Sequence, residues 1–187
     1  MHQHTHEHTH EHTHEHTHNL NRKAMVFPYI QKEPDMSEAG HSDTMRVLFL
    51  CTHNSSRSQM AEGLLRAHGG DHYVVFSAGT HPRSVHPLAI QAMREIGIDI
   101  SEAAGYRAKS LEEFIGQPPM DLVVTVCDEA AEECPFFPGA RHQEHWGFPD
   151  PSAVSGSETE RLAAFRSVRD QIAARITTFI DQTSGKE

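Results

Sequence analysis

The chain has 187 residues, 17 histidines and a formal net charge of −10. Residues 1–44 contain 7 of the 26 acids and 3 of the 16 bases, so residues 45–187 carry a net charge of −6. Those 143 residues make one domain of ordinary size. Their mild acidity excludes a nucleic-acid partner that is held by a basic face. No apolar run approaches the roughly 18–20 residues that cross a bilayer, and the N-terminus has no apolar signal region, so we expect a cytoplasmic protein with no membrane partner.

The N-terminus is a low-complexity tail in which every even position up to 18 is histidine. Alternating polar residues offer no apolar face, so the tail 1–18 and the linker 19–44 are predicted to be disordered, ahead of a single domain 45–187. Imidazoles two positions apart can bind a transition metal; an affinity tag or an inert repeat explains the same pattern. The candidate metal ligands are His2, His4, His6, His8, His10, His12, His14, His16 and His18.

Hydrophobic periodicity alternates between strand-like and helix-like along the domain. Short continuous apolar runs are typical of strands buried on both faces of a parallel sheet. Apolar residues at helical spacing indicate helices, the second of which opens at Pro87 and is expected to turn Ile96 inward. In chain order the predicted elements are strand 46–51, helix 57–68, strand 73–77 ended by Ala78-Gly79, helix 87–97, short helix 111–115, strand 121–126, a weaker strand near 141–145 and helix 158–182.

This alternation predicts an α/β fold. Buried parallel strands covered by helices on both faces form a three-layer αβα sandwich with a four-stranded, doubly wound sheet. Ligands of such sheets bind beyond the carboxyl ends of the strands. Cys51 and Cys127 both follow predicted strands, so we expect the two thiols to share one site.

Cys51 and Arg57 flank a strand-loop-helix turn that is predicted to bind an anion. Loop amides and a helix N-terminus can converge on a tetrahedral oxyanion, to which Arg57 would add a planar, permanent charge. The same positive field would stabilise the Cys51 thiolate as a nucleophile, with Ser58 donating a hydrogen bond to the sulfur. A buried cysteine followed by an ordinary surface arginine is the competing interpretation. The candidate oxyanion-binding residues are Thr52, His53, Asn54, Ser55, Ser56, Arg57 and Ser58.

Residues 47–63, VLFLCTHNSSRSQMAEG, resemble the signature of the low-molecular-weight protein tyrosine phosphatase fold. More narrowly, they resemble the thioredoxin-coupled arsenate reductases built on that fold, with further matches at 77–79, 121–127 and 144–151. The resemblance implies reduction of arsenate to arsenite for arsenic detoxification, with thioredoxin as electron donor and no required cofactor. It also implies a monomer, and phosphate or sulfate as competing oxyanions.

The resemblance further implies roles for all three cysteines. Cys51 attacks arsenic while Asp150 acts as general acid; Cys127 then attacks Cys51, and Cys134 attacks Cys127. Two electrons would leave the site as a Cys127–Cys134 disulfide that thioredoxin reduces. Judged from the residues alone, Cys127 and Cys134 are equally consistent with buried structural thiols, and Asp150 with a turn carboxylate before proline.

Two alternatives concern the same site. A phosphatase of this fold, hydrolysing phosphotyrosine or aryl phosphates through a cysteinyl-phosphate intermediate, needs only the loop thiol, its arginine and an acid; the two further cysteines favour the reductase. Some relatives bind a potassium ion beside the loop, where Asn54, Glu62 and Ser77 match its contributors. A threonine of that pattern is missing, with Ala103-Ala104 in its region, which counts against the ion.

Overall fold

The computed structural model describes residues 44–128 and 135–185. The histidine tail with its candidate metal ligands, the linker up to residue 43 and Cys134 lie outside the described residues. In the part that is described, no helix is long and apolar enough to cross a membrane. The strands and α-helices are β1 Met45–Cys51, α1 Arg57–Gly69, β2 Tyr73–Gly79, α2 Pro87–Arg94, β3 Met120–Thr125, β4 Ala140–His145 and α3 Glu158–Ser184.

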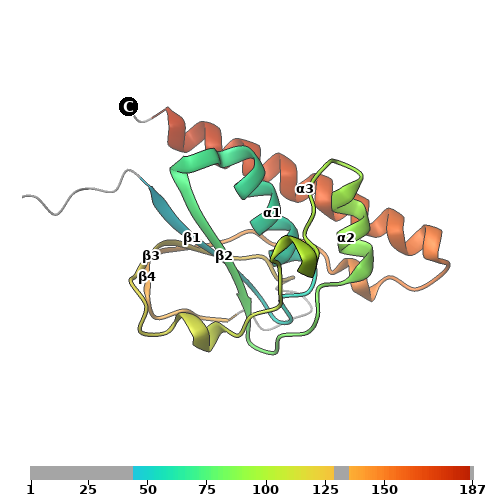
Figure 1. The fold of residues 1–187 in the computed structure, drawn as a ribbon, viewed down its shortest axis with the longest axis horizontal. Coiled ribbons are helices and arrows are strands. Elements are labelled where there is room, and N and C mark those ends of the chain that lie inside the picture. Colours follow the sequence, from blue (N-terminus) through green and yellow to red (C-terminus); the bar gives the residue numbers. More distant parts are fainter. Residues whose placement is uncertain (1–43, 129–134, 186–187) are drawn as a thin grey trace, which may run out of the picture. The chain divides into compact units, whose positions relative to one another are not determined.

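The four strands form one parallel sheet in the order β2-β1-β3-β4 (Figure 1). After β1 the chain winds to one side to form β2, and then crosses to the other side of β1 to form β3. The winding direction therefore changes beside β1, and the carboxyl ends of β1 and β3 border the crevice where such sheets bind ligands. Cys51 is the last residue of β1 and pairs with Gly79 of β2. The predicted α/β, doubly wound fold is confirmed.

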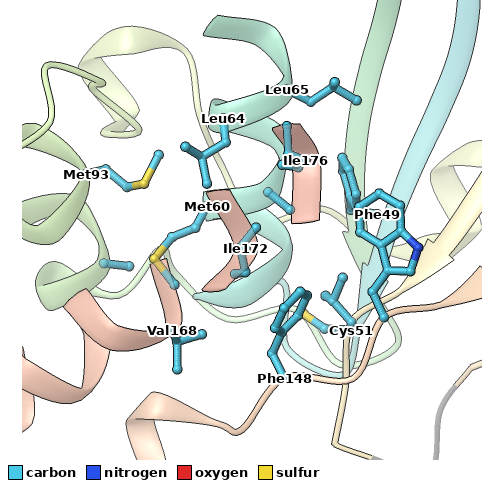
Figure 2. Close-up of a cluster of buried hydrophobic side chains, with 14 of the residues drawn as sticks. Phe49, Cys51, Met60, Leu64, Leu65, Met93, Phe148, Val168, Ile172 and Ile176 are labelled. Atoms are coloured by element: carbon cyan, nitrogen blue, oxygen red, sulfur yellow. The ribbon is translucent and has the colours of Figure 1, made fainter. Parts of the chain in front are cut away.

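The two faces of the sheet have separate cores because strand side chains alternate between faces. Val47 and Phe49 of β1 point toward α1, α2 and α3, where they pack with Met60, Leu64 and Ile172 (Figure 2). The intervening residues of β1 point the other way, into a smaller cluster that includes Phe137 and residues of a short 3-10 helix over Leu111–Phe114. The predicted helix near 111–115 is this 3-10 turn.

Two predicted boundaries were wrong. β2 continues through Ala78 and Gly79 rather than ending before them, because both residues stay paired with β1. α2 ends at Arg94, and Gly97, with a φ of 80°, turns the chain afterwards. Ile96 is consequently 42% exposed instead of facing inward, and Ile100, just beyond the turn, is fully buried in its stead.

His86 joins α2 to the rest of the domain. Its Nδ1 accepts a hydrogen bond from the Leu88 amide at 3.1 Å, capping the helix ahead of Pro87, and its ring lies 4.6 Å from the ring of Phe165. Burial lowers the pKa of His86 below its ordinary value of 6.5; the charge of Arg161 acts in the same direction, whereas that of Asp150 opposes it. Folding thus favours the neutral imidazole.

This preference makes the stability of the domain depend on pH. The unfolded chain binds a proton at His86 more tightly than the folded chain, so the His86 contribution is lost as the pH falls below about 6.5. His86→Asn keeps a capping acceptor but does not titrate. We expect the free energy of unfolding of the parent chain, relative to this variant, to decrease between about pH 7.5 and about pH 5. Urea unfolding followed by circular dichroism measures the difference, and parallel pH profiles would contradict the assignment.

Candidate active site

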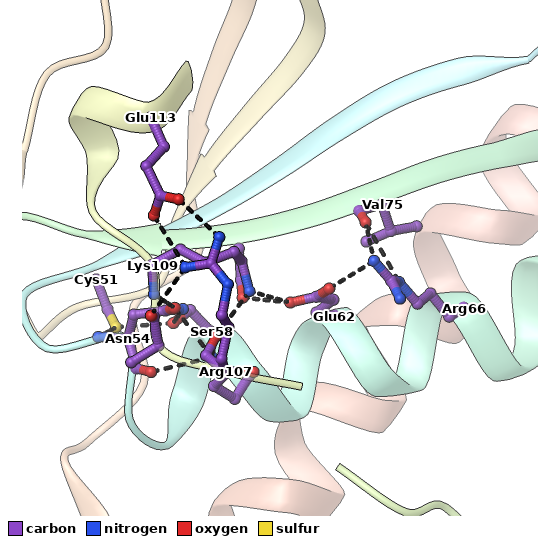
Figure 3. Close-up of polar contacts among 12 residues, drawn as sticks. Cys51, Asn54, Ser58, Glu62, Arg66, Val75, Arg107, Lys109 and Glu113 are labelled. Atoms are coloured by element: carbon purple, nitrogen blue, oxygen red, sulfur yellow. Dashed lines mark hydrogen bonds and ion pairs between the residues drawn. The ribbon is translucent and has the colours of Figure 1, made fainter. Parts of the chain in front are cut away.

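The Cys51 sulfur lies at the carboxyl end of β1 and receives hydrogen-bond donors from the following loop. Cys51 is a free thiol and is 3% exposed. The Asn54 amide donates to its Sγ at 3.1 Å, and Ser58 Oγ lies 2.9 Å from the same atom (Figure 3). Because Asn54 Nδ2 donates to Ser58 Oγ at 2.8 Å, the Ser58 hydroxyl hydrogen is available to the sulfur. Both donors stabilise a thiolate, the form that acts as nucleophile.

Asn54 holds the shape of the loop. It is fully buried and has a φ of 47°, a left-handed conformation that asparagine tolerates better than most residues. Its Oδ1 accepts hydrogen bonds from Gln59 Nε2 at 2.9 Å and from the Lys109 amide at 2.8 Å. Gln59 Nε2 also contacts the carbonyl of Arg107 at 2.9 Å. The loop is therefore joined to a segment more than fifty residues away in the sequence.

The segment that follows β2 supports the same loop from another side. The carbonyls of Thr52, His53 and Ser55 accept hydrogen bonds from backbone amides of residues 81–86 at 2.8–2.9 Å. The side chain of Ser55 donates to the carbonyl of Ser84 at 2.8 Å. Three carbonyls of the loop are therefore hydrogen-bonded to this segment, while the Asn54 amide is directed to the Cys51 sulfur.

The N-terminus of α1 completes the anion-binding geometry. Ser56 is the N-cap residue, and its side chain makes no capping hydrogen bond. The helix N-terminus next to the loop carries the partial positive charge that favours an anion. Arg57, the first helical residue, is buried, and its Nη1 donates to the Phe148 carbonyl at 3.1 Å. This contact holds the guanidinium against the loop that carries Asp150.

Asp150 lies at the edge of the site. Its Oδ2 is 3.8 Å from Arg57 Nη2, and its Oδ1 accepts hydrogen bonds from the amide and hydroxyl of Ser152 at 2.9 and 2.7 Å. One carboxylate oxygen thus caps the short 3-10 helix Pro151–Ala153, while the other points toward the arginine. The structure thus places the Asp150 carboxylate beside the guanidinium of Arg57, the first residue of α1.

Cys127 lies at the neighbouring strand end. The amide of Val126 donates to the carbonyl of Leu50 at 2.8 Å, so Cys51 and Cys127 each follow a paired residue at the same edge of adjacent strands. Cys127 is fully buried and disulfide-bonded. Since Cys51 is a free thiol, the Cys127 disulfide does not involve it.

Candidate metal positions give a mixed result. Within residues 44–128 and 135–185, no group of three or more His, Cys, Asp or Glu side chains is arranged to hold a metal ion. Glu62 and Ser77 are in contact through a hydrogen bond, and Asn54 is connected to Glu62 through Lys109. Lys109 was not predicted to belong to the site, and Gln59 and Gly79 were identified only as parts of matching motifs. Gln59 adjoins the loop motif, but the roles of Lys109 and Gly79 depend on tertiary contacts that no local pattern encodes.

The fold and site match known proteins over nearly the whole domain. Residues 46–187 match the family described as low molecular weight phosphotyrosine protein phosphatase. Arsenate reductases of Halalkalibacterium halodurans and Bacillus subtilis are 47% and 44% identical over 135 residues, covering 72% of this chain and 94% of each relative. The chain therefore belongs to the low-molecular-weight phosphotyrosine protein phosphatase family, and within it to the arsenate reductase group.

Solved structures agree with that placement. An arsenate reductase in its oxidized state superposes with a TM-score of 0.61 at 34% identity, covering 75% of this chain and 99% of the other. A thioredoxin-dependent arsenate reductase of Corynebacterium glutamicum gives a TM-score of 0.58 at 28% identity, covering 79% and 65%. The resemblance drawn from the sequence, and the class of enzyme that it implied, are confirmed.

Gly79 provides a test of how closely β2 supports the oxyanion loop. A Cβ at this position would lie 2.7 Å from the Thr52 carbonyl oxygen and 2.8 Å from the Asn54 nitrogen, both backbone atoms. We expect Gly79→Ala to lower the free energy of unfolding by about 1–3 kcal/mol and to weaken binding of inorganic phosphate, because the loop must shift. Gly185→Ala, where the nearest contact is an ordinary 3.4 Å, serves as control. Urea unfolding and calorimetric titration measure both quantities; phosphate binding that matches the parent chain would refute the close approach.

Proposed function

We propose that this chain reduces arsenate to arsenite through a three-cysteine relay that thioredoxin regenerates. One observation carries the proposal: Cys51 is a free thiol in an oxyanion loop, whereas Cys127, at the adjacent strand end, is bonded to a sulfur other than that of Cys51. The chain has three cysteines, of which one is a free thiol and another is oxidised. A reductase that delivers two electrons needs such a combination, because its thiols end as a disulfide. The names of the chain's relatives support the substrate and the electron donor.

In the first step arsenate occupies the loop, held by the amides of residues 52–57 and the N-terminus of α1. The Arg57 guanidinium, fixed by the Phe148 carbonyl, pairs with the arsenate oxygens as a planar fork. The Cys51 thiolate attacks arsenic and forms a sulfur–arsenic bond. An arsenic–oxygen bond breaks, and Asp150 protonates the departing oxygen so that it leaves as water.

In the second step Cys127 attacks the Cys51 sulfur. A disulfide forms, the sulfur–arsenic bond breaks, and its electron pair stays on arsenic, which is reduced from As(V) to As(III) and leaves as arsenite. Cys134 then attacks Cys127 and releases Cys51 as a thiolate. The observed combination, a free Cys51 and a disulfide-bonded Cys127, has the redox pattern expected after this exchange. Thioredoxin reduces the resulting disulfide and returns both thiols.

The physiological role that follows from this reaction is arsenic detoxification. We place it in the cytoplasm, where thiols are kept reduced and thioredoxin is available, and we expect the chain to act as a monomer. Phosphate and sulfate share the tetrahedral shape and charge of arsenate, so both are expected to compete for the loop.

A phosphatase acting on phosphotyrosine or aryl phosphates is the second candidate. Cys51, Arg57 and Asp150 suffice for it, and the family description names that activity. After Asp150-Pro151, however, the chain continues with Ser152, Ala153 and Val154 rather than with aromatic residues that would line a phosphotyrosine slot. The Cys127 disulfide also has no task in phosphate ester hydrolysis.

Turnover of arsenate with thioredoxin, thioredoxin reductase and NADPH separates these functions. We expect the parent chain to consume NADPH, and Cys51→Ser, Cys127→Ser and Cys134→Ser each to fall to background, because every thiol has a separate place in the relay.

Binding of inorganic phosphate is the control. Cys127→Ser should retain it, since the oxyanion loop does not include that thiol. Continued arsenate reduction by Cys127→Ser would refute the relay, and hydrolysis of p-nitrophenyl phosphate without any arsenate reduction would establish the phosphatase instead.

A further inference from the structure

Glu62 is a buried carboxylate beside the oxyanion loop. It lies on α1 one helical turn after Ser58, and it is 2% exposed. Its Oε1 is 2.7 Å from Arg66 Nη2, and its Oε2 accepts a hydrogen bond from Ser77 and lies 3.5 Å from Lys109 Nζ (Figure 3). A buried negative charge beside an anion site has two costs. The carboxylate loses its hydration on burial, and it repels the anionic ligand. Glu62 therefore requires compensating positive charge.

Lys109 supplies that charge from a sheltered position. Its side chain is 14% exposed, and its Nζ also donates to the Arg107 carbonyl at 2.9 Å. Arg66, by contrast, is about half exposed, so its charge is more strongly screened by water. Burial lowers the pKa of Lys109 below its ordinary value, and the Glu62 carboxylate acts in the opposite direction, favouring the charged ammonium.

The backbone of Lys109 ties the same residue to the loop. Its amide donates to Asn54 Oδ1 at 2.8 Å, and its carbonyl accepts from the Gly79 amide at 2.9 Å. Asn54 in turn contacts Cys51 Sγ through its amide and Ser58 Oγ through Nδ2. Lys109 thus connects the charge balance at Glu62 with the residue that shapes the oxyanion loop.

The potassium ion that the family resemblance suggests does not fit this arrangement. Both carboxylate oxygens of Glu62 and the Oδ1 of Asn54 already accept from donors, two of which are the cationic groups of Arg66 and Lys109. A potassium ion bound to Glu62 would lie next to the Lys109 ammonium. Two positive charges this close repel each other strongly in a sheltered site, where water screens them poorly.

We propose that the Lys109 ammonium acts as a built-in monovalent cation for Glu62, so that this chain binds oxyanions without potassium. Removing the side chain vacates the space beside Glu62 Oε2, where a potassium ion can take the place of the ammonium. Lys109 is a positioning residue that acts through Glu62 and Asn54. The inference rests on the proposed function only in that the loop binds a tetrahedral oxyanion, so its test needs neither arsenate nor a reductant.

The test compares affinity for inorganic phosphate and thermal stability in potassium chloride and in choline chloride at equal ionic strength. The parent chain should give the same values in both salts. In choline chloride, Lys109→Ala should bind phosphate roughly tenfold more weakly, because Glu62 loses its sheltered counter-charge. Potassium chloride should restore the affinity of this variant to within about threefold of the parent and raise its Tm by roughly 3 °C, since the ion enters the vacated space.

Two matched variants separate charge from volume. Lys109→Met keeps most of the side-chain volume but not the charge, so it should lose affinity and remain unresponsive to potassium. Arg107→Ala removes a positive charge two residues away that pairs with Glu113 instead of Glu62, and it should behave as the parent in both salts. A potassium response of the parent chain would overturn the proposal even if no variant folds. A Lys109→Ala chain that binds phosphate normally, or that potassium does not rescue, would overturn it as well.

Discussion

The hydrogen bonds of Asn54 are the constraint on which the site depends. This one residue donates through its backbone to the nucleophilic sulfur, donates through its side chain to Ser58, and accepts from Gln59 and from the Lys109 backbone. Its backbone is left-handed, and in this conformation its own amide reaches the Cys51 sulfur. Full burial gives these bonds a low-dielectric setting, where each is stronger and its loss more costly. The loop is consequently preorganised for an anion before the anion arrives.

The sheet topology determines which groups can meet in that loop. In the strand order β2-β1-β3-β4 the chain changes its winding direction beside Cys51, and β3, the neighbouring strand, leads to Cys127. The two cysteines therefore lie at the ends of adjacent strands that are hydrogen-bonded to each other. Asp150 comes from a separate loop, and its place is held by Arg57 through the Phe148 carbonyl. Cys51 and Arg57 are thus placed by a strand and a helix, whereas the position of Asp150 depends on a side-chain contact.

Most of the fold could be predicted from the sequence because it depends on local sequence patterns. Continuous apolar runs indicated the buried strands, and apolar residues at helical spacing indicated the helices. Cys51 and Arg57 could be predicted to share a site because both belong to one strand-loop-helix turn. Ile96 was misplaced because helical periodicity does not reveal where a helix stops. Lys109 was missed for a different reason: its importance comes from Glu62, which lies 47 residues earlier, and an isolated lysine carries no signal of such a partner.

The burial of Cys51 limits which molecules can reach its thiol directly. Cys51 is only 3% exposed, so its thiol lies too deep for the surface of a second protein to reach and is accessible at most to a small ion. In the proposed relay, substrate and protein reductant therefore use different entrances: the oxyanion reaches Cys51 through the loop, and electron pairs arrive by way of other sulfurs. This separation protects the reactive thiol from bulky oxidants and allows the anion pocket to be shaped for its ligand alone. The same proposal implies a longer electron route, which passes from one cysteine to the next.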